Sequence, residues 1–139
     1  MSHFDDVKAF HQKFGLLVSE QPTHLTRRKL RERVECLQEE LEEFMLAVDS
    51  QSLPEQADAL IDLVYFALGT AVMMGLPWDE LWADVQRANM SKVRGETKRG
   101  HKVDVTKPVG WVAPQGHGIL ARHGYQGYDG EEYCLDDAL

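Results

Sequence analysis

Apolar positions recur at helical spacing through the first two-thirds of the chain. Residues 4–14 show this spacing, and residues 26–48 show it most clearly, as a seven-residue repeat. The repeating positions are Leu30, Val34, Leu37, Leu41, Phe44 and Val48. No stretch before residue 95 alternates with the period of two that a half-buried strand shows. The pattern therefore predicts an all-α fold.

Two further helices are expected after residue 50. Ser52 lies three residues before Glu55, with Pro54 in the first turn, which is a capping-box signal for a helix over residues 53–74. Its second half is apolar nearly all round, so we expect it to be central and buried. Pro77 opens a fourth helix that runs to about residue 93. One side of that helix carries Trp78, Leu81, Trp82, Val85 and Ala88.

The last third of the chain differs in composition. Eight of the 11 glycines lie from residue 95 onwards, together with Pro108 and Pro114. We predict a loop or extended tail here, with at most a short turn of helix or strand. Because one short bundle cannot cover every apolar helix face, the sequence predicts a four- to five-helix bundle completed by oligomerisation. The expected domain covers residues 1–113, and a glycine-rich tail covers residues 114–139.

Charge and composition exclude several classes of protein. The net charge of -8 argues against a nucleic-acid binder or a protein of anionic membrane surfaces, because both need basic fields. The longest apolar run is short for a membrane span and contains Asp62. The two cysteines have no metal-type spacing, and no signal peptide is visible. We therefore expect a cytoplasmic protein.

Four glutamates occupy five positions of the second helix: Glu39, Glu40, Glu42 and Glu43. Like charges three and four residues apart on a helix repel. Glu39, Glu40 and Glu43 share an arc of about 100°, whereas Glu42 points elsewhere. Taken alone, this pattern is typical of a solvated helix face.

The third helix changes that interpretation. Asp58 and Asp62 lie one turn apart, and Asp62 sits in the most apolar part of the chain. A buried carboxylate must be protonated, paired with a base such as Arg33 or Arg87, or bound to a cation. If the second and third helices pair, four or five carboxylates converge and need cations. Oxygen ligands without His or Cys favour Mg²⁺, with Mn²⁺ as the alternative.

Polar residues also continue the apolar side of the fourth helix. Asn89 and Lys92 follow the face of Trp82 and suit a phosphate or nucleotide. Lys92 alternatively lies at the helix end simply because its charge suits the helix dipole. The basic run over residues 27–33 is interpreted as a solvated helix start, and the six histidines show no ligand spacing.

Four segments together resemble a known family. They are "EELEE" at residues 39–43, "DALIDLVYFALGTAVMMGL" from residue 58, "RANMSK" from residue 87 and "KPVGW" from residue 107. They are similar to the MazG-like all-α nucleoside triphosphate pyrophosphohydrolases, above all to bacterial and phage members. This family includes phosphoribosyl-ATP pyrophosphohydrolases and dimeric dUTPases. The resemblance covers about residues 7–113.

The resemblance implies a Mg²⁺-dependent enzyme that converts a nucleoside triphosphate to the monophosphate and pyrophosphate. It implies metal ligands at Glu39, Glu40, Glu43 and Asp62, with Asp58 or Glu55 as the second-motif acid. Glu40 and Glu43 are then candidates for orienting water, and Lys92 for stabilising charge. Asn89 and Lys92 would contact the nucleotide, and the base would stack on Trp78, Trp82 or Trp111. The family also implies a homodimer or homotetramer.

Several rival functions stay open on the sequence. The same fold acts on purine deoxynucleoside triphosphates or on phosphoribosyl-ATP in the family that the chain resembles. A non-catalytic helical dimer, with the acids as surface decoration, is the alternative from another functional class. We expect no nucleic-acid or membrane partner in any of these cases.

Overall fold

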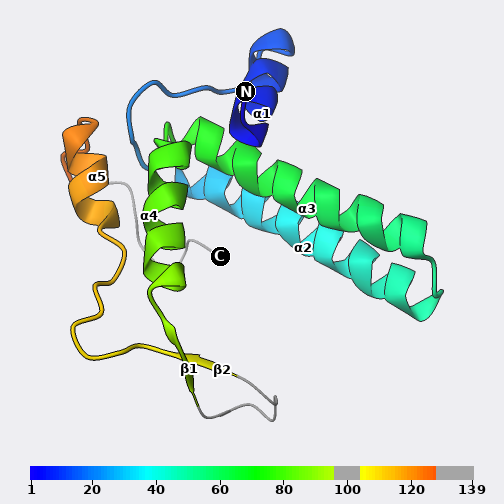
Figure 1. Cartoon of the computed structure of the whole chain (residues 1–139). Helices are drawn as coiled ribbons and strands as arrows, with labels where there is room; N and C mark the ends of the chain where they lie inside the picture. Colours follow the sequence, from blue (N-terminus) through cyan, green and yellow to red (C-terminus); the bar gives the residue numbers. More distant parts are fainter. Residues whose placement is uncertain (96–103, 128–139) are drawn as a thin grey trace. The chain divides into compact units, whose positions relative to one another are not determined.

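The computed structural model describes residues 1–95 and 104–127 and contains five helices and one two-stranded sheet within those ranges. The element bounds are α1 His3–Lys13, α2 Arg27–Asp49, α3 Leu53–Met73, α4 Trp78–Met90, β1 Val93–Gly95, β2 Asp104–Thr106 and α5 Gly116–Arg122. The chain forms two compact units (Figure 1). One comprises Met1–Leu76 with the segment that begins at Gly124, and the other comprises Pro77–His123. The all-α prediction is confirmed, because the sheet is very small.

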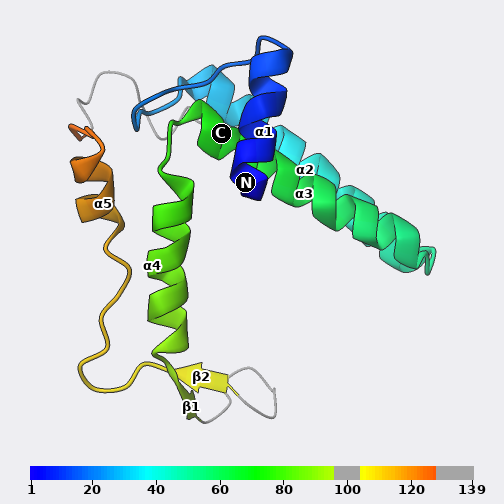
Figure 2. The same cartoon turned by 45° about the horizontal axis from the view of Figure 1, so that its top comes forward.

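The first unit is built on the hairpin of α2 and α3, which lie side by side in both ribbon views (Figures 1 and 2). Each helix starts where the sequence predicts. Thr26 caps α2 by accepting a hydrogen bond from the backbone N–H of Lys29, and Ser52 caps α3 in the same way for Glu55. Gly75 ends α3 with a φ of 63°. The two strongest helix predictions are confirmed to within one residue.

Helix α1 packs against α3, away from the turn that joins α2 to α3 (Figures 1 and 2). Both α1 and α2 come close to α3 at Gly69. A Cβ atom there would lie 3.0 Å from Nε2 of His11 on α1 and 2.8 Å from Nη2 of Arg33 on α2. His11 is buried, and its Nδ1 lies 2.9 Å from the Leu17 carbonyl oxygen. His11 therefore has a structural role in positioning α1.

Burial along the hairpin is uneven. The second half of α3 is buried at Leu68, Ala71, Val72 and Met73, as the sequence predicts for a central helix. The first half of α3 and the second half of α2 carry exposed apolar side chains, whereas the α2 repeat positions Leu30, Val34, Leu37 and Phe44 are half-buried. Large apolar side chains are exposed at Leu41, Met45, Leu46, Val48, Leu60, Ile61 and Val64. The expectation of a helix buried along its whole length is therefore not met by one chain alone.

Helix α3 is long and apolar enough to cross a membrane, a property that the core helix of a soluble protein shares. Asp58 and Asp62 interrupt its apolar surface, and α1 and α2 pack against it. Both features favour the core helix of a soluble domain.

The second unit holds α4, the β1–β2 hairpin and α5. β1 and β2 pair antiparallel, with Val93 opposite Thr106. Helix α4 ends at Met90 rather than near residue 93, because residues 93–95 extend into β1. The predicted tail contains a short helix, α5, inside residues 114–139. The predicted domain boundary after residue 113 lies within this second unit, and residues 128–139 of the predicted tail lie outside the described residues.

Candidate active site

Three carboxylates from α2 and α3 converge on one point. One oxygen each from Glu40, Glu43 and Asp62 lies within 4.8 Å of the other two. Glu40 and Glu43 lie three residues apart and share a face of α2, and Asp62 meets them from the neighbouring helix. Glu40 and Asp62 are half-buried, whereas Glu43 is exposed. The convergence that the sequence predicts between the two helices is therefore present for these three acids.

The cluster is electrostatically strained. Partial burial, followed by the neighbouring charges of Glu43 and Asp62, raises the pKa of Glu40 above its usual range. Partial burial raises the pKa of Asp62 as well, with further repulsion from Asp58 and Glu43. Oε2 of Glu40 is buried and has no hydrogen-bond partner in the described part of the chain. A buried acceptor without a donor is costly, so this oxygen needs a proton or a cation.

Arg33 does not pair with Asp62, because its guanidinium is engaged elsewhere in the first unit. It donates from Nε to Thr70 Oγ1 at 3.0 Å and from Nη2 to the Phe66 carbonyl at 2.9 Å. Arg87 belongs to the second unit, where it forms an ion pair with Asp84. Among the described residues of the first unit, no Lys, Arg or His pairs with the three clustered acids. The salt bridge to Arg33 is therefore excluded, which favours a proton or a cation.

The donor set of the cluster suits a hard divalent cation. It offers only carboxylate oxygens, which Mg²⁺ and Mn²⁺ prefer, and it lacks the His or Cys ligands typical of zinc sites. The orphaned Glu40 oxygen and the two raised pKa values show that the three acids repel one another without a counter-charge. The residues present therefore fit a bound Mg²⁺ or Mn²⁺ ion.

The remaining acids lie around the cluster. Asp58 and Glu55 line a groove of about 470 Å³ with Glu43, and Asp58 also acts electrostatically on Asp62. Glu55 Oε2 lies 3.5 Å from Ser50 Oγ, at the first turn of α3. Glu39 contributes repulsion to Glu40 but is not among the three clustered acids. The roles of Glu39, Asp58 and Glu55 as ligands stay predictions.

The expected substrate-binding residues belong to the second unit and are described there by themselves. Lys92 Nζ donates to Asn89 Oδ1 at 3.1 Å, so these two side chains meet at the end of α4, as their spacing predicts. Trp82 is largely exposed on the same helix, and its ring centroid lies 6.3 Å from that of Trp78. The structure thus brings Asn89 and Lys92 together, while their contact with a nucleotide stays a prediction.

The sequence did not reveal that Lys107 lies near Lys92. Lys107 Nζ lies 4.9 Å from the centroid of the Trp111 ring, and Lys92 Nζ lies 5.7 Å from the same centroid. The segment "KPVGW" contains both Lys107 and Trp111. In the sequence, Lys107 and Trp111 are close together along the chain, but this spacing does not reveal that both lie near Lys92.

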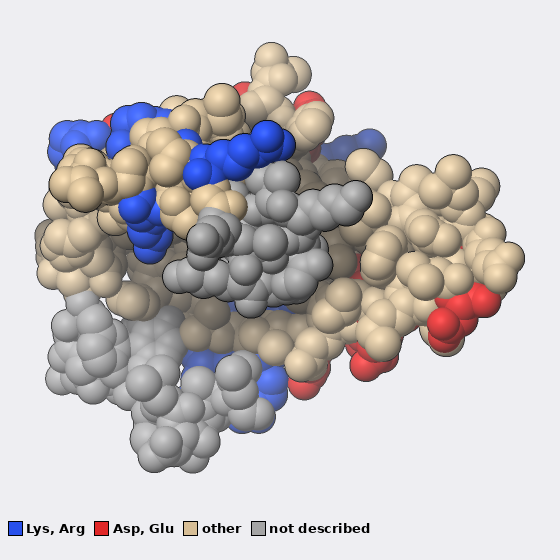
Figure 3. Space-filling view, turned by 60° about the horizontal axis from the view of Figure 1, so that its bottom comes forward, with Lys and Arg blue, Asp and Glu red and all other residues tan. Residues whose placement is uncertain are grey.

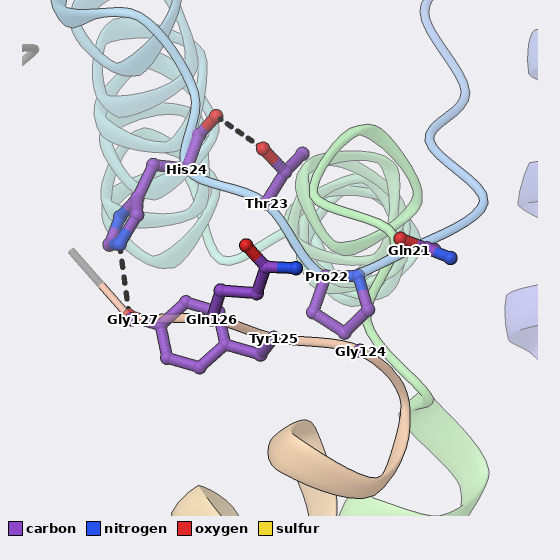
Figure 4. Close-up of a pocket in the computed structure, with 8 residues that line it drawn as sticks. All are labelled: Gln21, Pro22, Thr23, His24, Gly124, Tyr125, Gln126 and Gly127. Atoms are coloured by element: carbon purple, nitrogen blue, oxygen red, sulfur yellow. Dashed lines mark hydrogen bonds between the residues drawn. The ribbon is translucent and has the colours of Figure 1, made fainter. Parts of the chain in front are cut away.

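A separate polar pocket lies in the first unit, between the loop before α2 and the segment after Gly124 (Figure 4). His24 Nε2 lies 3.0 Å from Tyr125 Oη across this pocket. Gly124, with a φ of 98°, lies against the Gln21 side chain. The contact between His24 and Tyr125 ties the later segment to the start of α2, and none of the predicted site residues lines the pocket.

Residues 7–89 match the model of the phosphoribosyl-ATP pyrophosphohydrolase family. The chain belongs to this family. The match contains the three clustered acids and ends at Asn89, so Lys92, Lys107 and Trp111 lie beyond it. Membership makes the chain a pyrophosphohydrolase-like nucleotide hydrolase, an enzyme that acts on acid anhydrides. No protein of established function gives a match over the chain.

Proposed function

We propose that the chain is a Mg²⁺-dependent pyrophosphohydrolase that converts a nucleoside triphosphate, preferentially a deoxy one, to the monophosphate and pyrophosphate. One observation supports this most strongly. Glu40, Glu43 and Asp62 meet at one point, with raised pKa values for Glu40 and Asp62 and without a basic partner among the described residues. Such a site is stabilised by a divalent cation, and phosphate oxygens complete the coordination shell of Mg²⁺ in many enzymes.

The reaction requires attack of a water oxygen on the α- or the β-phosphorus and cleavage of the bond between the attacked phosphorus and the oxygen that bridges the two. A bound Mg²⁺ supplies neutralisation of the phosphate charge and lowers the pKa of a coordinated water. Glu40 or Glu43 orients the water and accepts its proton.

The residues at the end of α4 would bind the substrate rather than change it chemically. Lys92 stabilises negative charge on the phosphates, and Asn89 both holds the Lys92 ammonium and offers an amide to the nucleotide. Trp82 presents an exposed ring that suits stacking on a base. These assignments extend the predicted roles and are supported by the contact between Asn89 and Lys92.

Phosphoribosyl-ATP is the second candidate substrate, and the family match favours it. Both candidates contain the same phosphoanhydride, so the acidic cluster serves either of them. The purified chain should therefore be tested with the deoxynucleoside triphosphates, the ribonucleoside triphosphates and phosphoribosyl-ATP, with and without Mg²⁺. Pyrophosphate release is the measurement. Release from one substrate class identifies the substrate, and no release from any compound by a folded protein contradicts the enzymatic proposal.

We also propose a homo-oligomer, which would cover the open apolar face of the α2–α3 hairpin. Leu46 and Ile61 are 67% and 65% exposed, and their neighbours on both helices are exposed too. Apolar surface of this extent on a helical hairpin is typical of a subunit interface. Sedimentation of the wild-type chain should show a dimer or tetramer, whereas Leu46→Glu with Ile61→Glu should shift it towards the monomer. A monomeric wild-type chain would contradict the proposal.

A further inference from the structure

Residues 107–115, between β2 and α5, are joined to α4 by several hydrogen bonds. Trp111 Nε1 donates to the Ala88 carbonyl at 2.8 Å, and Ala88 is fully buried. Arg87 donates to the carbonyls of Val112 and Ala113 at 3.3 and 3.2 Å. Asp84 accepts a hydrogen bond from the backbone N–H of Gln115 at 2.5 Å. These contacts fix the place of Trp111 against the last turns of α4.

The Trp111 ring gathers two ammonium groups. Lys107 Nζ lies 4.9 Å and Lys92 Nζ lies 5.7 Å from its centroid, both within the range of a cation–π contact. Lys92 is further held by Asn89 Oδ1 at 3.1 Å. The ring therefore keeps two like charges near one place, where each raises the electrostatic free energy of the other.

Several other cations of the chain are already paired with acids. Arg87, Lys29 and Arg122 form ion pairs with Asp84, Glu32 and Glu80, respectively. Within residues 1–95 and 104–127, neither Lys92 nor Lys107 forms an ion pair with a carboxylate. Two adjacent cations without an anion, in a protein of net charge -8, form a site that an anion with several charges would stabilise.

We propose that Lys107 and Lys92, positioned by the Trp111 ring, form a binding site for the phosphate chain of a nucleotide. Lys107 and Lys92 contact the phosphates directly, and Trp111 is a positioning residue. Two ammonium groups near one ring can engage neighbouring phosphates of the same chain, where charge-assisted hydrogen bonds are strong. The identity of the anion as a substrate phosphate rests on the proposed function, but the anion site itself does not.

The face drawn in Figure 3 carries Lys and Arg side chains as well as Asp and Glu side chains on the surface of this acidic protein. A nucleic acid is therefore the rival ligand for a basic surface. We favour the nucleotide, because the two lysines are concentrated at one ring and the overall charge of -8 opposes binding of a long polyanion.

Binding of inorganic triphosphate in the absence of divalent cations tests the site without turnover. Isothermal titration calorimetry should show binding to the wild-type chain and a dissociation constant about tenfold higher for Lys107→Gln. Lys107→Arg should keep affinity within about threefold, because it keeps the charge. Lys13→Gln is the matched control, since Lys13 Nζ lies 5.4 Å from the Phe14 ring centroid in the other unit. It should bind triphosphate as the wild type does.

The role of Trp111 is tested by two substitutions. Trp111→Leu removes the ring and should weaken triphosphate binding, whereas Trp111→Phe keeps a ring face and should restore most of the affinity. If the lysines only neutralise the carbonyls at the end of α4, Lys107→Gln will lower the melting temperature and leave triphosphate affinity unchanged. That result, or no binding of triphosphate by the wild type, would overturn the proposal.

Further results distinguish the anion site from the proposed function and from a nucleic-acid site. Binding of triphosphate that depends on Lys107, in a chain that hydrolyses no nucleotide, would retain the anion site and reject the proposed function. Normal hydrolysis with an unchanged KM in Lys107→Gln would retain the function and reject the site. If Lys107→Gln loses affinity only for a single-stranded oligonucleotide and not for triphosphate, the site is one for nucleic acid and the proposal is wrong.

Discussion

Two sets of carboxylates show how differently the same side chains are used in this chain. On α4, Glu80 meets His123 and Arg122, and Asp84 meets the backbone N–H of Gln115 and Arg87, so the pKa of each acid is lowered. On α2 and α3, partial burial and then the charges of nearby acids raise the pKa of Glu40 and the pKa of Asp62. The first set is satisfied within the chain, and it holds α4, α5 and the stretch before α5 together.

The second set requires something that the chain does not supply among its described residues. Repulsion between ionised carboxylates is a cost that folding alone would not select. A cluster that keeps this cost while donors elsewhere satisfy other acids is typical of a functional site. The difference between the two sets therefore supports the proposal that the catalytic chemistry lies at the α2–α3 hairpin.

The largest expected effect is on turnover. Glu43→Gln and Asp62→Asn each remove one charge from the cluster and should lower Mg²⁺-dependent pyrophosphate release by about a hundredfold or more. Glu42→Gln, one residue from Glu43 on the same helix, is the matched control and should retain the wild-type rate. A near-normal rate in Asp62→Asn would show that this acid does not belong to the active site.

A second prediction concerns the melting temperature without a divalent cation. Replacing an acid should change it in opposite directions in the two sets. Asp62→Asn removes repulsion and should leave the melting temperature unchanged or raise it by a few degrees. Asp84→Asn removes the charge and one of the two oxygens that accept hydrogen bonds from Arg87 and Gln115, and it should lower the melting temperature by a few degrees. Thermal unfolding in a chelating buffer makes the measurement. A loss of stability in both variants would remove the contrast between the two sets.

The smallest expected effect is the pH dependence of the decrease in melting temperature caused by Asp84→Asn. The backbone hydrogen bond from Gln115 and the Arg87 guanidinium lower the pKa of Asp84 below its ordinary value of 3.8. Its contribution to stability is therefore present above that value and is lost as the pH falls through the lowered pKa. The difference in melting temperature between the wild type and Asp84→Asn should be full at pH 7 and shrink below about pH 4. A difference that stays constant to pH 3 would show that the contribution is not electrostatic.

The sequence predicted those features that depend on local spacing. The repeat from Leu30 to Val48 and the cap at Ser52 place α2 and α3 almost residue by residue. Because both helices were placed, the meeting of Glu40 and Glu43 with Asp62 followed from their spacing and from an antiparallel hairpin. The sequence placed Asn89 and Lys92 on one side of the fourth helix, and the structure adds the hydrogen bond between them just after α4 ends.

The features that the sequence did not reveal depend on contacts between distant residues. The indole of Trp111 reaches the Ala88 carbonyl across 23 positions, and the β1–β2 pair, with Val93 opposite Thr106, brings Lys107 near Lys92. The β1–β2 pair lacks enough residues for a visible alternation. The sequence predicted uncovered apolar surface but not which positions of α2 and α3 stay exposed, since periodicity shows that a face is apolar but not which surface covers it.

Direct binding of Mn²⁺ is the measurement that tests the central claim most directly. Electron paramagnetic resonance of free Mn²⁺, titrated with protein and without nucleotide, reports the affinity of the acidic cluster alone. We predict that the wild type and Glu42→Gln bind Mn²⁺ equally, and that Asp62→Asn binds it about tenfold or more weakly. Equal binding by Asp62→Asn and the wild type, or no binding by the wild type, would contradict a divalent-cation site formed by Glu40, Glu43 and Asp62.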